Sequence, residues 1–138
     1  MTDLIFSPEA IQYAQALASA ERIALMIRGH LAGKAIPLQE STLSAEVEHV
    51  FMATATPYRR EAVLSDADRV DFLVGTIAVE LKVRRISDGD LDDQLGRYAE
   101  SRQVSGLVLV APWGPRLPRY VIYGKPVLLC IHPGIGRL

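Results

Sequence analysis

The segment RVDFLVGTIAVELKV, residues 69–83, constrains the fold more than any other, because apolar residues occupy every second position around a single glycine. Alternation with a period of two is typical of β-strands, and a two-residue loop that begins with glycine is a favoured hairpin turn. We therefore place the turn at Gly75 and Thr76, so that Val74 pairs with Ile77 and the pairing continues outward from there. The segment is predicted to form a β-hairpin.

The two faces of this hairpin carry different kinds of side chain. One face is apolar throughout and consists of Val70, Phe72, Val74, Ile77, Val79, Leu81 and Val83. The other face brings together Asp71, Leu73, Ala78, Glu80 and Lys82. The register puts Asp71 directly opposite Glu80, where Cβ atoms lie about 4.5–5.5 Å apart and like charges are destabilising. Two carboxylates held this close need a cation between them, or one of them must be protonated.

Mg²⁺ suits such a pair, because it prefers one or two carboxylates together with waters and phosphate oxygens. A metal at this place activates a water and neutralises charge on a phosphodiester, and Lys82 beside it orients or deprotonates the water. The trio of Asp71, Glu80 and Lys82 therefore predicts metal-assisted hydrolysis of a phosphodiester, with Mg²⁺ as the cofactor and Mn²⁺ as its substitute. The alternative is an amphipathic hairpin whose polar face is solvated. That alternative explains Lys82 but not the opposed carboxylates.

The remainder of the chain has the patterns of a mixed α/β domain, and 138 residues are enough for one domain with its own core. Helices are predicted over residues 7–33, 43–53 and 91–102. Strands beyond the hairpin are predicted over residues 61–64, 106–111, 119–123 and 127–131. Residues 1–138 then form a single domain with three parts: an N-terminal helical extension (1–40), a core (43–111) and a C-terminal strand pair (112–138).

The first of these helices begins at a good N-cap, Ser7, followed by a proline at the first helical position. One apolar stripe runs along it and consists of Tyr13, Leu17, Ala20, Ala24, Ile27 and Leu31. The stripe either packs into the core or forms the seam of a dimer, and the helix either continues throughout or breaks near Ser19.

Composition excludes several classes of protein. No apolar run approaches the roughly 18–20 residues that span a bilayer, and the start of the chain lacks the basic region of a secretory signal. The single cysteine, Cys130, excludes a cysteine-rich zinc site and fits a reducing cytoplasm. The net charge of −1 means that any phosphate binding depends on a local basic patch or on a metal.

The pattern of Asp71 followed by Glu80-Leu81-Lys82 on the next strand resembles the D…ExK signature of the PD-(D/E)xK nuclease superfamily. A proline often precedes the aspartate in that family; Val70 stands there here, a departure that members often show. The family has the restriction-endonuclease-like fold, whose core is α-β-β-β-α-β, a mixed sheet flanked by helices. Residues 43–111 are predicted in that order. The resemblance implies a Mg²⁺-dependent nuclease that acts on DNA.

The resemblance also implies roles for residues on the flanking helices. Members often place a glutamate of the first core helix in the metal shell; Glu46 lies beside the apolar stripe of that helix, whereas Glu48 points away from it. A solvated residue at the helix edge is the alternative for Glu46. Gln94 and Tyr98, one turn apart on the next helix, resemble the QxxxY element of exonuclease-V-like members, which lies near the active site and helps to place the substrate.

Four arginines are candidates for contacts with nucleic-acid phosphates: Arg59, Arg60, Arg84 and Arg97. Solvated surface arginines are the alternative for each. The rival to a nuclease is a non-catalytic subunit of the same fold that binds nucleic acid or assembles with a partner, because a fold does not determine a function. A homodimer, or a complex with a helicase or recombination partner, also remains open, as do the form of the DNA and the choice between endonuclease and exonuclease.

Overall fold

The structure is a computed structural model that describes residues 7–136. Its three helices are α1 (Pro8–Leu31), α2 (Glu40–Ala53) and α3 (Asp88–Ala99). Its strands are β1 (Arg59–Val63), β2 (Arg69–Val74), β3 (Ile77–Leu81), β4 (Gly106–Ala111), β5 (Val121–Ile122) and β6 (Lys125–Ile131). All six join one mixed sheet in the order β1-β2-β3-β4-β6-β5, with β3, β4 and β6 parallel and the other pairs antiparallel. The chain is therefore a mixed α/β protein.

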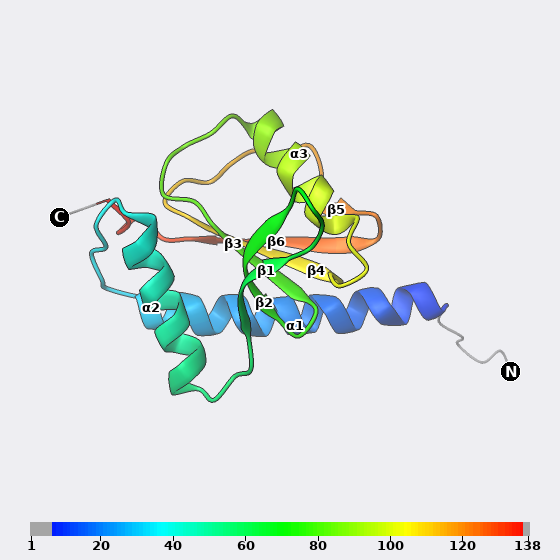
Figure 1. Cartoon of the computed structure of the whole chain (residues 1–138), viewed down its shortest axis with the longest axis horizontal. Helices are drawn as coiled ribbons and strands as arrows, with labels where there is room; N and C mark the ends of the chain where they lie inside the picture. Colours follow the sequence, from blue (N-terminus) through cyan, green and yellow to red (C-terminus); the bar gives the residue numbers. More distant parts are fainter. Residues whose placement is uncertain (1–6, 137–138) are drawn as a thin grey trace, which may run out of the picture.

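Helices cover both faces of the sheet (Figure 1). On one face, residues of α1 and α2 form an apolar cluster with inward side chains of the sheet, which include Phe72, Val79 and Val108. On the other face, α3 forms a second cluster in which Leu91 and Leu95 pack with Leu109. Strand β4 alternates between the two clusters and is buried along its whole length. A strand covered on both faces reads as a continuous apolar run, which is what the sequence shows there.

The helices begin where local capping favours it. The hydroxyl of Ser7 accepts from the amide of Ala10 at 3.1 Å, and the hydroxyl of Ser87 accepts from the amide of Asp90 at 3.1 Å. Helix α1 is continuous through Ser19. From Ala20 onward its buried residues join the cluster on the α1–α2 face, so α1 is part of the core rather than an appendage to it. None of the described helices is both long and apolar enough to span a membrane.

Element boundaries differ from the sequence-based prediction by a few residues. Helix α2 begins three residues earlier than expected, at Glu40, and α3 runs over 88–99 instead of 91–102. Strand β5 is only the pair Val121–Ile122, because Gly124 at φ +73° and Tyr123 at φ +52° turn the chain immediately after it. Helix and strand ends are the least certain part of any sequence pattern, since they depend on caps and turns.

The hairpin of β2 and β3 has the predicted turn and register. Val74 pairs with Ile77, Leu73 with Ala78, and Phe72 with Val79, and Gly75 adopts φ +60° in the turn. A left-handed conformation at this position is why glycine is favoured there. The ladder of paired residues does not extend to Asp71 and Glu80, and this end of the hairpin is the site described next.

Candidate active site

At the open end of the hairpin, hydrogen bonds from backbone amides to two carboxylates replace the pairing between backbones. The Oδ2 atom of Asp71 accepts from the amide of Leu81 at 2.7 Å, and the Oε1 atom of Glu80 accepts from the amide of Asp71 at 3.3 Å. Each acidic side chain is thus bound to the backbone of the neighbouring strand. The two carboxylates lie together, as the predicted register requires, although they are linked through side chains rather than as a ladder pair.

The backbone next to this pair is distorted. Strand β1 pairs with β2 on either side of Glu61 and Asp71 but not at these residues, and Glu61 has φ +49°, in the left-handed region. The alternation of faces fails here: Phe72 lies in the cluster on the α1–α2 face, whereas Val70 lies in the cluster on the α3 face. The prediction that Val70 shares a face with Phe72 is therefore wrong, because the distortion re-aims the strand. Such strained backbone concentrates at functional sites.

Glu80 is only 5% exposed, in contrast to the solvated residue that an ordinary hairpin face would carry. Its Oε2 atom lies 3.1 Å from the hydroxyl of Tyr98 and 3.3 Å from Nζ of Lys82. Burial raises the pKa of Glu80 to about 8, assisted by the negative charge of Asp71 and a hydrogen bond with it, while Lys82 and Tyr98 act in the opposite direction. Near neutral pH, one proton is therefore held by the acidic pair.

Helix α3 closes the site from the side through Gln94 and Tyr98. Nε2 of Gln94 donates to the hydroxyl of Tyr98 at 2.8 Å. That hydroxyl lies within donating distance of Glu80 Oε2 and of the carbonyl of Arg69, at 3.1 and 3.2 Å, and its single proton serves one of them at a time. Burial and the charge of Glu80 raise the pKa of Tyr98, so this hydroxyl stays neutral. The structure thus brings together Asp71, Glu80, Lys82, Gln94 and Tyr98.

Lys82 is held at the site by its own backbone. Its amide donates to the carbonyl of Val110 on β4 at 2.9 Å, which extends the parallel pairing of β3 by one residue. Its side chain is 21% exposed, so the ammonium group is within reach of both the acidic pair and solvent. A half-buried cation at this place partly balances the carboxylates and remains accessible to a substrate.

Glu46 is not brought to this site, in contrast to the expectation from the sequence. Its Oε2 atom lies 2.9 Å from Nε2 of His30 and 3.2 Å from Nζ of Lys34, both on α1. The hydrogen bond with His30 lowers the pKa of Glu46. Glu48, expected to point away, instead accepts from Arg60 and Tyr58 at the sheet. Helix α2 packs on α1 and on the sheet at once, and its apolar stripe alone does not indicate which flank faces α1 and which faces the sheet.

The candidate phosphate-contacting arginines have different surroundings. Arg60 donates to Glu48 and Ser44, Arg59 donates to Gln103 at 2.7 Å, and Arg97 pairs with Asp68 at 3.1 Å. Arg84 is exposed, and within residues 7–136 it forms no ion pair. Of the four, Arg84 has the guanidinium most available to a phosphate.

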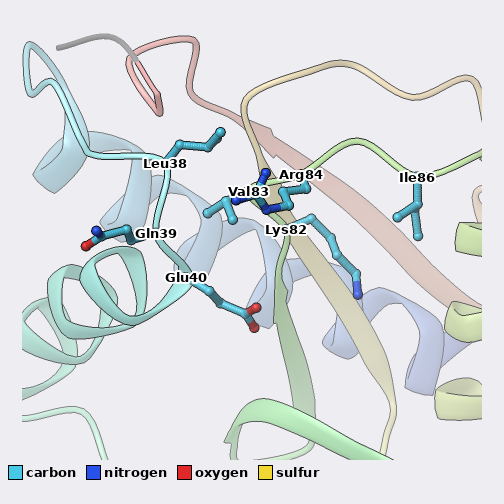
Figure 2. A pocket seen from close by; sticks show the side chains of 7 residues that line it. All are labelled: Leu38, Gln39, Glu40, Lys82, Val83, Arg84 and Ile86. Carbon is cyan, nitrogen blue, oxygen red and sulfur yellow. The ribbon is translucent and has the colours of Figure 1, made fainter.

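Sequence reasoning missed one acidic residue near the site. Glu40, the first residue of α2, lines a pocket together with Lys82, and its carboxylate extends toward the lysine side of that pocket (Figure 2). The only signal in the sequence was an acidic residue in the first turn of a helix, which is ordinary there. Glu40 becomes a candidate site residue only because the fold places the end of β3 against the start of α2.

The donor set restricts which metal would fit. Within the described part of the chain, no group of three or more His, Cys, Asp or Glu side chains is arranged to hold a metal ion. Asp71 and Glu80 supply two carboxylates, which matches Mg²⁺, since that ion keeps several waters and takes further oxygens from a substrate phosphate. A structural zinc site, which needs four protein ligands, does not fit.

The assembled site is an acidic pair with a neighbouring lysine, a buried tyrosine and a glutamine, at the open end of a hairpin. Comparison with family models, with curated protein sequences and with solved structures found no match to this chain.

Proposed function

We propose that the chain is a Mg²⁺-dependent nuclease that hydrolyses phosphodiester bonds of DNA at Asp71, Glu80 and Lys82. The observation that carries this proposal is the acidic pair itself: two carboxylates bound to each other's strand, one of them almost fully buried, with an ammonium group 3.3 Å away. Burying an acid is unfavourable unless it is paired or protonated, so a site that keeps one beside another acid suits a cation.

Each residue then has a separate task. Asp71 and Glu80 would hold the ion, which when bound lowers the pKa of a coordinated water and offsets the charge of the phosphodiester. Lys82 donates hydrogen bonds to the attacking water or to the charge that develops on the phosphoryl oxygens. Tyr98, held by Gln94, keeps the Glu80 carboxyl group in one orientation.

The order of elements supports the same proposal. From α2 to β4 the chain runs helix, three strands, helix, strand, with β1, β2 and β3 antiparallel and β4 parallel to β3. We include in the proposal that this part is a restriction-endonuclease-like core. In that arrangement the acidic pair lies where the sheet changes from antiparallel to parallel pairing.

A second candidate is a non-catalytic subunit that binds nucleic acid or assembles with a partner. One observation favours it: Glu80 in its protonated form has hydrogen-bonding partners in Asp71 and Tyr98, so the acidic pair does not require a bound metal ion. The net charge of −1 also gives the chain no overall basic excess to attract DNA, and Arg60 and Arg97 are paired with carboxylates of the chain itself. Metal binding separates the two candidates.

The deciding experiment measures cleavage of labelled single-stranded, duplex and branched DNA with and without Mg²⁺ or Mn²⁺. We expect Asp71→Asn and Glu80→Gln each to lower the cleavage rate at least about a hundredfold, because each removes a metal ligand. Glu46→Gln is the matched control, since that carboxylate pairs with α1, and it should cleave like the unaltered protein.

Circular dichroism establishes that each variant is folded, and calorimetric titration with Mg²⁺ and Mn²⁺ measures metal affinity. Cleavage that survives Asp71→Asn would show that the assignment is wrong. Folded protein that neither cleaves any DNA form nor binds either metal would favour the non-catalytic subunit.

A further inference from the structure

A pocket of about 440 Å³ lies directly beside the acidic pair. Its lining residues come from the start of α2 and from the segment after β3 (Figure 2), and they are Leu38, Gln39, Glu40, Lys82, Val83, Arg84 and Ile86. Lys82 belongs to both places, because its side chain lines the pocket while its Nζ lies 3.3 Å from Glu80. Anything bound in the pocket is therefore adjacent to whatever is held at the acidic pair.

The pocket has an apolar wall and a charged rim. Leu38, Val83 and Ile86 supply the wall, and Leu38 is 43% exposed although it is a large apolar residue. Lys82 and Arg84 supply two positive charges against the single carboxylate of Glu40. An apolar wall with a positive rim matches a molecule that has a flat apolar body and an attached phosphate.

The size of the pocket suits a single nucleoside. Pockets for single small molecules begin at about 300 Å³, so this one is large enough for one nucleoside. A nucleoside enters such a pocket only when it is unpaired, and extracting it from a duplex costs a few kcal/mol. Single strands, flaps and frayed ends avoid that cost.

We propose that this pocket receives one unpaired nucleoside next to the phosphodiester held by Asp71, Glu80 and Lys82, so that the preferred substrate is DNA with a single-stranded segment. The base lies against Leu38 and Ile86, and Arg84 contacts the neighbouring phosphate. The cleavage step rests on the proposed nuclease function, whereas binding of the nucleoside does not.

Binding is tested apart from cleavage, by fluorescence anisotropy of a labelled single-stranded octanucleotide and of the matching duplex, in EDTA and at low salt. The whole chain should bind the single strand at least tenfold more tightly than the duplex. The double variant Leu38→Ala, Ile86→Ala should weaken single-strand binding about tenfold, since loss of one base-packing surface has about this effect. The matched control is Leu25→Ala, which alters an exposed leucine of α1 outside the pocket. Its affinity for the single strand should equal that of the unaltered protein.

Two further variants protect the test against misfolding and address the phosphate. The volume-conserving double variant Leu38→Met, Ile86→Leu should bind the single strand like the unaltered protein, because it keeps the apolar wall that the alanine variant removes. Arg84→Ala should lower the salt dependence of binding by about one counterion, because it removes one phosphate contact.

The outcomes for the pocket and for the nuclease are distinguishable. If single-strand binding depends on Leu38 and Ile86 while no DNA is ever cleaved, the pocket assignment holds and the nuclease proposal fails. If DNA is cleaved but the alanine double variant binds the single strand like the unaltered protein, the pocket assignment is overturned and the nuclease proposal stands. Equal affinity of the unaltered protein for single strand and duplex also overturns it.

Discussion

A carboxyl group that is 5% exposed, as in Glu80, is more stable as the neutral acid unless cations offset its burial, and the Lys82 ammonium group 3.3 Å away does so only in part. Glu80 therefore places a cost on the folded protein that a glutamine of the same shape would avoid. Asp71 adds to this cost, because its negative charge disfavours ionisation of its neighbour. At the scale of single residues, the acidic pair is an arrangement that stability alone does not explain.

The proton held by Glu80 makes the stability of the protein depend on pH. The pKa of Glu80 is about 8 in the folded protein against 4.5 for the ordinary group, so between these pH values the folded protein holds a proton that the unfolded chain has released. This contribution to the free energy of unfolding is fully present below pH 4.5 and is lost as pH rises toward 8, at up to about 1.4 kcal/mol per pH unit.

Urea unfolding of Glu80→Gln in EDTA, at pH values from 5 to 9, measures this contribution. Since glutamine cannot ionise, the variant should gain stability relative to the unaltered protein as pH rises. Glu21→Gln, an exposed position on α1, should show no such gain. Parallel stability curves for Glu80→Gln and the unaltered protein would contradict the prediction.

At the scale of elements, α3 is what completes the site. The hairpin supplies the acidic pair and Lys82, but Tyr98 and Gln94 reach Glu80 only because α3 packs across this face of the sheet. The helix is short, spanning Asp88–Ala99, so its start depends on the Ser87 cap. A helix of three turns that carries two site residues should be sensitive to its cap.

Ser87→Ala should lower the free energy of unfolding by about 1 kcal/mol, because it removes the hydroxyl that accepts from the amide of Asp90. Ser87 lies one turn before Leu91, which is fully buried, so the loosened first turn carries a core residue. Ser7→Ala removes a cap bond of the same 3.1 Å length and is the matched control. The first buried residue of α1 is Ala16, so loosening its first turn should cost much less. Urea unfolding compares them, and equal losses would show that α3 is not the more dependent helix.

At the scale of the whole molecule, two apolar clusters on opposite faces of one sheet share the central strand β4. Neither cluster can open without disturbing that strand, which predicts cooperative unfolding. Cys130 on β6 is a reporter of this behaviour. It is fully buried in the cluster on the α1–α2 face, and burial raises the pKa of its thiol.

Cys130 should react with a thiol reagent only when the protein unfolds, because both access and the thiolate form require exposure. If opening is global, Ser87→Ala on the far face should speed the reaction about fivefold, in proportion to its loss of about 1 kcal/mol. The variant Leu25→Cys, at a position that is 63% exposed, should react at once and serves as the positive control. If Ser87→Ala leaves the reaction rate of Cys130 unchanged, the thiol is exposed by local opening instead.

Sequence alone determined the parts that depend on neighbours along the chain. The hairpin turn at Gly75, its register, the cap at Ser7 and the order of elements were all predicted, because alternation, capping and turn formation are local. The approach of Asp71 to Glu80 follows from the same register, so the centre of the candidate site was also within reach of the sequence.

Only the tertiary structure decided which flank of each helix meets the sheet. In the folded protein Glu46 pairs with His30 of α1, whereas Glu48 accepts from Arg60. Glu40 lines the pocket beside Lys82, and the buried Glu80 contacts the hydroxyl of Tyr98. A helix packed between two partners can rotate by a few tens of degrees without changing its apolar pattern, and such a rotation exchanges the neighbours of every residue at the edge of the stripe. Contacts between elements are set by that rotation, which no local pattern records.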